Sequence, residues 1–168
     1  MTDINRDTID RLVGIDHSSN LYITRHQRDK VAHATQGSEI GLFDPNLPGL
    51  SLQERLLAAL LACHVTPNEI LKQEYLDRLA TIGTPRALIK TIIDGHFEIL
   101  ESKRLEAVMR FTHTLITDPI RADRTALLKL KEAGLSTPEI VTLAQLIAFI
   151  SYQIRLAAGL SAMKSLER

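Results

Sequence analysis

The stretch GLSTPEIVTLAQLIAFISYQIRLAAG, Gly134–Gly159, decides the fold class of this chain. It predicts one long helix with almost no face for water, because Glu139 and Arg155 are the only charged residues from 139 to 158. A helix turns by about 100° per residue, so most polar residues of this stretch lie along one edge of the helix and the others lie roughly on the opposite side. Two apolar sides remain, and a helix that is apolar on two sides must be covered twice. We expect one side to face its own domain and the other to face a second subunit.

Outside this stretch, cap and breaker residues divide the chain into further helices. Ser51 and Glu54 form a predicted capping box at the start of a Leu- and Ala-rich helix. The loop FDPNLPG over 43–49 precedes it, and Pro67 is expected at the first position of the following helix. No sustained alternation or hairpin signal predicts a strand. The predicted helices before the long terminal one cover 7–13, 19–34, 52–65, 67–80, 85–94, 102–117 and 124–133.

Length and composition favour one cytoplasmic domain. The 168 residues predict a single domain over 1–168, with a helical extension and loop over 1–49 and a core over 50–168. Twenty basic residues balance twenty acidic ones, so neither nucleic acid nor an anionic membrane is an expected partner. The polar start MTDINRDTIDRL does not resemble a signal peptide, and unbroken apolar runs are shorter than the roughly 20 residues that span a bilayer. A single cysteine excludes an internal disulfide and a cysteine-based metal cluster.

Three segments together resemble one protein family. The segment ESKRLEAVMRFTHTLITDPIRADRTALLKLKEAGLSTPEIVTLAQLIAFISYQIRLAAGL, 101–160, resembles the second half of the carboxymuconolactone decarboxylase, or alkylhydroperoxidase-D-like (AhpD-like), superfamily. LSLQERLLAALLA, 50–62, resembles the helix before that family's active site, and 12–45 is similar to a subgroup of its members. The resemblance implies an all-α, AhpD-like helical bundle that assembles as a homo-oligomer, as a dimer, trimer or hexamer.

The redox members of this superfamily use a Cys-x-x-Cys pair at a helix start, with an upstream Glu and a downstream His. Aligned on that pattern, this chain has Leu56 at the Glu position, Asn68 and Leu71 at the cysteine positions, and Tyr75 at the His position. With one cysteine in the chain, peroxide reduction by two cysteines of one subunit is excluded. The decarboxylase members carry histidines nearby, where this chain has glutamates at 69 and 74, so that activity is not expected either.

Four residues remain as candidates for catalysis. Cys63 is expected to be a buried thiol with a raised pKa, with a one-cysteine nucleophile as the alternative. His64, at the end of the same helix, is expected to interact with the last carbonyls, with a general base as the alternative. Glu74 is expected to be solvated and paired with Arg78 one turn later. Tyr75 fits either the family's pocket or the core.

Other polar residues are predicted to be structural, and neither a cofactor nor a metal is expected. The N-terminal histidines are spread along the chain, and a basic group interrupted by Asp29 is predicted to be a solvated face. These two sets are His17, His26 and His33, and Arg25, Arg28 and Lys30.

Two hypotheses of function follow. The first is a redox-silent, oligomeric binding or accessory protein, with a related redox-active member of the superfamily as a further partner. The alternative is an enzyme. It would be either an antioxidant peroxidase relying on Cys63 alone, or an acid/base enzyme acting on a small lactone or carboxylate through His64 or Glu74.

Overall fold

The computed structural model describes residues 7–166, and over this range the chain forms nine α-helices, two short 3-10 helices and no strand. The predicted all-α class is confirmed. The elements are α1 (Thr8–Val13), α2 (Asn20–His26), α3 (Asp29–Leu42), α4 (Leu52–Val65), α5 (Glu69–Thr81), α6 (Arg86–Ile93), η1 (Phe97–Ile99), α7 (Lys103–Thr117), η2 (Pro119–Arg121), α8 (Arg124–Glu132) and α9 (Thr137–Leu166).

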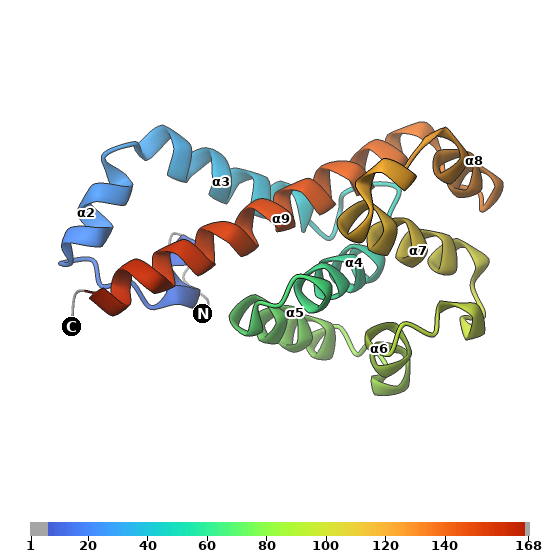
Figure 1. Cartoon of the computed structure of the whole chain (residues 1–168), viewed down its shortest axis with the longest axis horizontal. Coiled ribbons are helices and arrows are strands. Elements are labelled where there is room, and N and C mark those ends of the chain that lie inside the picture. The colour runs from blue at the N-terminus through green and yellow to red at the C-terminus, as the bar shows by residue number, and fades with distance from the viewer. Residues whose placement is uncertain (1–6, 167–168) are drawn as a thin grey trace.

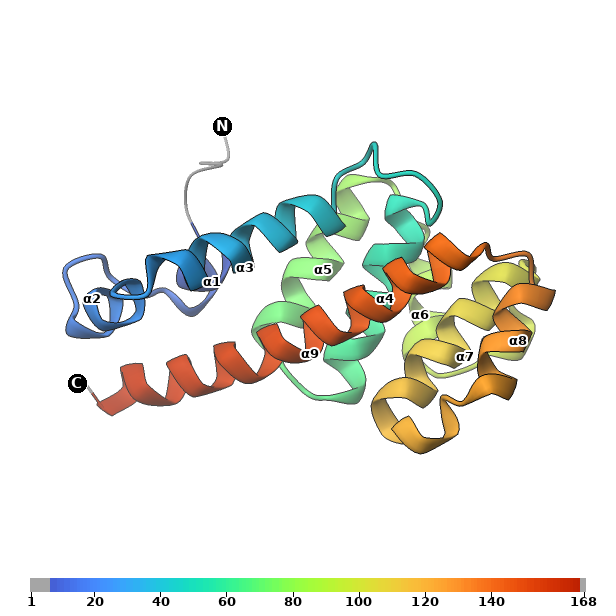
Figure 2. The ribbon, with the colours of Figure 1, turned by 90° about the horizontal axis from the view of Figure 1, so that it is seen from above.

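Helix α9 crosses the whole molecule and joins its two ends (Figures 1 and 2). It begins after Ser136, whose backbone N–H donates to Glu139 Oε2 at 2.7 Å. It continues for 30 residues, so the expected end at Gly159 is wrong. The reason is tertiary: the C-terminal part packs beside α1, and Lys164 Nζ donates to the carbonyl of Val13 at 2.9 Å. Such packing outweighs the low helix propensity of one glycine.

Helix α4 forms the centre of the fold, with α5, α7 and α9 around it (Figure 1). All nine residues from 55 to 63 are buried, and the only charged one is Arg55. Its guanidinium donates to three carbonyls, those of Leu42 at 2.5 Å, Asp44 at 2.9 Å and Ser51 at 3.3 Å. Arg55 therefore holds the loop between α3 and α4 against the core, and these bonds offset the cost of burying its charge.

The predicted helix over 19–34 is instead two helices. The chain breaks at Arg28, whose φ of −109° and ψ of 61° are not helical, and α3 then runs through Gly37 to Leu42. Figure 2 shows α3 lying alongside the C-terminal half of α9. Thr35 and Glu39, on either side of Gly37, contact Tyr152 and Gln153 of α9, and Gly37 does not end the helix as the sequence suggested.

The prediction that Arg25 belongs to a solvated face is also wrong. Arg25 donates to Asp7 Oδ2 at 3.0 Å and to Asp10 Oδ1 at 2.7 Å, and its side chain is 9% exposed. His26 Nε2 lies 2.7 Å from the other oxygen of Asp10. These contacts turn α2 back onto α1, and they explain why the chain bends between α2 and α3.

Local cap signals were accurate except at the two prolines expected to start helices. Pro85 precedes α6, which begins at Arg86. The capping box of Ser51 and Glu54 is present, and Ser102 caps α7. Pro67, however, lies outside its helix: α5 begins at Glu69, and the side chain of Asn68 accepts the N–H of Leu71 at 3.1 Å. Asparagine is among the strongest N-cap residues, so the helix starts there and not at the proline.

By length and composition, α9 is the one helix in the described range that is apolar enough to cross a membrane, with a mean hydropathy of 1.5. A buried core helix passes the same test. Much of α9 is buried inside the protein, where it packs against α4.

Candidate functional site

The most buried polar cluster joins three helices: α3 contributes Glu39, α5 contributes Tyr75 and Arg78, and α9 contributes Gln153. Glu39 lies at the centre, because Arg78 Nη1 donates to its Oε1 at 2.7 Å and Gln153 Nε2 donates to its Oε2 at 3.0 Å. Tyr75 Oη donates to Gln153 Oε1 at 3.1 Å. The cluster therefore forms one chain of hydrogen bonds from the phenol to the guanidinium.

An aromatic side chain lies beside this cluster. The guanidinium of Arg78 lies 4.2 Å from the centre of the Phe43 ring, and the Phe43 and Tyr75 rings are 5.5 Å apart. A cation over a ring face is favourable. Arg78 is the most exposed member, at 27% of its side chain, whereas Glu39 is 7% exposed. Solvent reaches the cluster from the Arg78 side.

Burial shifts the pKa of both acids in the cluster toward the protonated form. It raises the pKa of Glu39 above its usual 4.5, although the charge and hydrogen bond of Arg78 oppose this. Burial also raises the pKa of Tyr75 well above its usual value, and the charge of Glu39 adds to that rise. Desolvation penalises a charge that water no longer stabilises. The phenol of Tyr75 is thus held as a hydrogen-bond donor.

Cys63, on α4, has the properties expected of a structural thiol. It is fully buried, and its pKa is raised to about 12 by burial and then by the charge of Glu39. The nucleophile in thiol chemistry is the thiolate, which this environment disfavours. The predicted buried cysteine with a raised pKa is confirmed.

The other two candidates have separate surroundings. The expected pair of Glu74 with Arg78 does not form. Glu74 instead accepts a hydrogen bond from Arg11 Nη2 at 2.9 Å. It is 18% exposed, so the prediction of a solvated side chain is wrong as well. The reason is that Arg78 is already bonded to Glu39. His64, half-buried in the last turn of α4, contributes to the lowered pKa of Asp94, behind the larger effect of the Lys90 hydrogen bond.

The positions that the resemblance aligned with a redox motif hold structural side chains. Asn68 caps α5 and donates to the Ile154 carbonyl at 3.3 Å. Leu71 and Leu56 are each 1% exposed, and Tyr75 is bonded to Gln153. The start of α5 is therefore a capped helix start with buried side chains beside it.

The structure brings Cys63 and Tyr75 to Glu39 and leaves His64 apart. Sequence reasoning missed Glu39, Arg78 and Gln153 as members of one cluster. The available signal was Gln153, a polar residue between apolar neighbours in the long apolar helix, since such a residue needs a partner when it is buried. Its partner, Glu39, lies 114 positions away in the sequence, and no local sequence pattern around Glu39 predicts this contact.

A separate set of side chains lines a small cavity in the N-terminal part. The histidines at 17, 26 and 33, which the sequence only showed as scattered, line one pocket of about 210 Å³ with Asp10 and Tyr22. Across residues 7–166, no three His, Cys, Asp or Glu side chains are grouped so that they could hold a metal ion.

Comparison of the sequence with models of known families and with curated proteins gives no match. The geometry of the cluster is therefore the main guide to its chemistry. It raises the pKa of Glu39 and holds the phenol of Tyr75 protonated, and the thiol of Cys63 is not activated.

Proposed function

We propose that this chain is a redox-silent member of the carboxymuconolactone decarboxylase superfamily that works as an oligomeric binding or accessory protein. The observation that carries the proposal is the state of the motif positions. Asn68 is a helix cap, Leu71 is buried, and the one cysteine lies elsewhere with a pKa of about 12. A scaffold with this arrangement keeps its helices but has no activated thiol.

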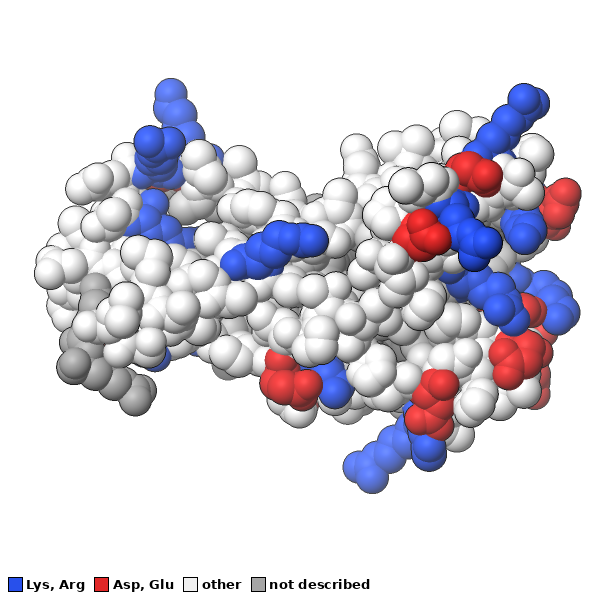
Figure 3. Space-filling model, viewed as in Figure 1, with Lys and Arg blue, Asp and Glu red and all other residues white. Residues whose placement is uncertain are grey.

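Self-association is proposed through the outward face of α9. Large apolar side chains remain exposed along it: Val141, Tyr152 and Met163 are 49%, 42% and 51% exposed. The space-filling view shows few charged side chains over the middle of this side of the molecule (Figure 3). Arg155 is the only charged residue on α9 between Glu139 and Lys164. Interfaces are depleted of charge at their centre, as this face is.

A groove beside α9 extends the same face. It has a volume of about 480 Å³ and lies between α3 and α9, with Leu42, Leu47 and Phe149 among the side chains that line it. Thr35 and Tyr152 approach within 3.4 Å through their hydroxyl groups along the same pair of helices. We propose that a second copy of the chain covers α9 and this groove, and that a related redox-active protein is a further partner.

Light scattering after size exclusion tests the assembly. The natural chain is expected to elute as a dimer, trimer or hexamer, and Ala148→Glu, on the exposed side of α9, is expected to shift it toward the monomer. Ala80→Glu, on the exposed side of α5, is the matched control and should leave the mass unchanged. A natural chain that is monomeric at all concentrations overturns the proposed assembly.

Hydroperoxide consumption with excess external dithiol tests the absence of redox activity. We expect the natural chain and Cys63→Ser to match the rate without protein. Turnover by the natural chain that is lost in Cys63→Ser would instead establish a one-cysteine peroxidase.

A further inference from the structure

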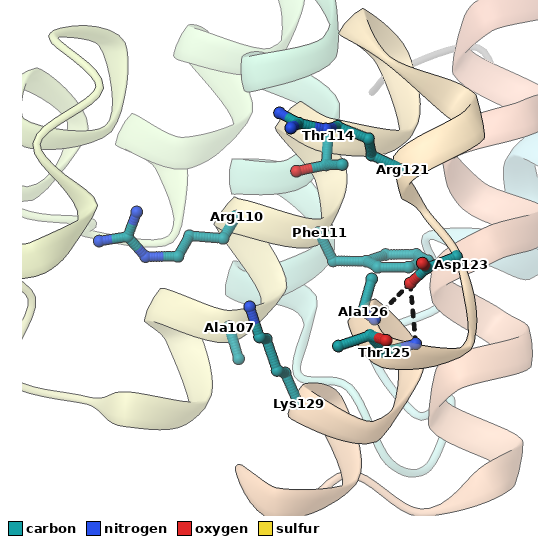
Figure 4. A pocket seen from close by; sticks show the side chains of 9 residues that line it. All are labelled: Ala107, Arg110, Phe111, Thr114, Arg121, Asp123, Thr125, Ala126 and Lys129. Atoms are coloured by element: carbon teal, nitrogen blue, oxygen red, sulfur yellow. Dashed lines mark hydrogen bonds between the residues drawn. The ribbon is translucent and has the colours of Figure 1, made fainter.

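A third cavity, formed by residues remote in sequence from the buried cluster, opens between α7 and α8. It has a volume of about 420 Å³, within the range of small-molecule sites. Figure 4 shows the Phe111 ring near its middle, with Thr114 and Arg121 to one side and Lys129 to the other. The Arg110 side chain extends away from these groups. The residues that line the cavity are Ala107, Arg110, Phe111, Thr114, Arg121, Asp123, Thr125, Ala126 and Lys129.

The charges around this cavity are unbalanced toward the positive. It is lined by three cationic side chains and by one carboxylate, that of Asp123. That carboxylate caps α8, because its Oδ1 accepts hydrogen bonds from the backbone N–H groups of Thr125 at 2.8 Å and Ala126 at 3.1 Å. The start of α8 is therefore capped, and an anion in the cavity would have to be bound by side chains.

One of the three cations, Lys129, is free to bind such an anion. Arg110 is bonded to Glu106 at 2.9 Å and lies 3.7 Å from Glu98, so it is neutralised by neighbours. Arg121 has only a long contact of 3.7 Å to Asp118 and is 81% exposed. Among the residues that the structure describes, Lys129 has no carboxylate partner.

The remaining wall of the cavity is formed by apolar side chains together with Thr114 and Thr125. Phe111 is 6% exposed and is flanked in the cavity by Ala107 and Ala126. A hydrated inorganic ion would leave this wall uncovered, whereas a molecule with a carboxylate and an apolar body would satisfy both parts. We propose that this cavity binds a small monocarboxylate with an aromatic or short aliphatic body, its carboxylate held by Lys129 and its body packed on Phe111.

Calorimetric titration of the full chain with benzoate, benzamide, acetate and inorganic phosphate tests the proposal. Benzoate should bind more tightly than the other three, because benzamide lacks the charge and acetate and phosphate lack the apolar body. Lys129→Gln should weaken benzoate at least about tenfold, as expected for loss of a charge-assisted hydrogen bond, and Arg121→Gln, on the other side of Phe111, should weaken it less.

Lys131→Gln is the matched control, since Lys131 is an exposed lysine on the same helix that does not line the cavity. It should leave benzoate binding unchanged. Equal binding of benzoate and benzamide, equal binding of phosphate and benzoate, no binding of benzoate, or equal affinity in Lys129→Gln and Lys131→Gln would overturn the proposal. The site does not depend on the assembly through α9, so its failure leaves the proposed function untouched.

Discussion

Gln153 and Glu39, 114 positions apart, share a buried hydrogen bond of 3.0 Å from Nε2 to Oε2. Gln153 also accepts from the Tyr75 hydroxyl at 3.1 Å, so it connects the phenol to the carboxylate. This residue couples α9 to both α3 and α5. The polar cluster is therefore a structural link between the terminal helix and the rest of the bundle, and its stability should depend on the proton at Glu39.

The first prediction concerns Glu39→Gln and pH. Burial raises the folded-state pKa of Glu39 above 4.5, so as pH rises past 4.5 the unfolded chain releases this proton before the folded chain does. Stability contributed by Glu39 must then fall with rising pH until the folded-state pKa is passed. Denaturant titrations should show that the natural chain loses stability relative to Glu39→Gln over that window.

Glu69→Gln is the control for this series, because the Glu69 side chain is 80% exposed. Its difference from the natural chain should vary much less with pH. A difference between the natural chain and Glu39→Gln that stays constant above pH 4.5 would contradict the raised pKa.

The second prediction concerns the reactivity of Cys63. Because the thiol is fully buried and its pKa is raised to about 12, a disulfide reagent should modify it only when the protein opens. Labelling should be slow under native conditions and fast in denaturant, where one thiol per chain should react. Fast labelling of the folded chain would show an accessible thiolate and would restore the one-cysteine hypothesis.

Substitutions at the same position separate packing from chemistry. Cys63→Ser should lower the free energy of unfolding by about 1–3 kcal/mol, because a buried hydroxyl without a partner is costly. Cys63→Ala avoids that polar penalty and should cost less. A serine variant as stable as the natural chain would show that position 63 is less buried than the structure has it.

The helix starts were predictable because each depends on residues within one turn. The capping box of Ser51 and Glu54 and the cap at Ser102 are of this kind. Pro67 was misassigned because two start signals competed over adjacent positions, and the side chain of Asn68 supplied the hydrogen bond that a proline cannot.

The candidate site was not predictable in the same way. Burial of Cys63 followed from its apolar neighbours, but the partners of Glu74 and Arg78 depend on helices distant in sequence. Their spacing of four positions fits a local ion pair of a few tenths of a kcal/mol, and a buried Glu39 offers Arg78 a stronger one. The spacing of charged residues on one helix does not show whether a residue on another helix will take the place of the local ion-pair partner.

The third prediction concerns Arg55→Met. The substitution keeps a long apolar stem in the core but removes donors from three carbonyls, those of Leu42, Asp44 and Ser51. The carbonyls of Asp44 and Ser51 keep the backbone N–H donors of Leu47 and Arg55, so the cost arises mainly at the Leu42 carbonyl. We expect a loss of about 1–3 kcal/mol in the free energy of unfolding. Urea titration measures the loss. Arg86→Met, at an exposed position of α6, should change stability by no more than about 0.5 kcal/mol. An equal loss in the two variants would mean that the carbonyl bonds contribute little.

The last prediction concerns acid and the start of α9. Arg104 joins two helix starts, since its Nε donates to Glu54 Oε1 at 2.9 Å and its Nη2 donates to Glu139 Oε1 at 2.6 Å. Hydrogen bonds from the backbone and hydroxyl of Ser136, and then from Arg104, lower the pKa of Glu139 from 4.5 to about 2. A lowered carboxyl pKa stabilises the fold fully above pH 4.5, and that stabilisation is lost as the pH falls toward about 2.

Glu139→Gln should therefore be less stable than the natural chain near neutral pH, and the two should converge as the pH falls toward about 2. Thermal unfolding across this range measures the difference. Glu132→Gln, at an exposed position at the end of α8, is the matched control and should follow the natural chain throughout. If the deficit of Glu139→Gln were the same at both ends of the range, its cause would be altered packing. Convergence would instead show that the negative charge at Glu139 holds the start of α9 against Arg104.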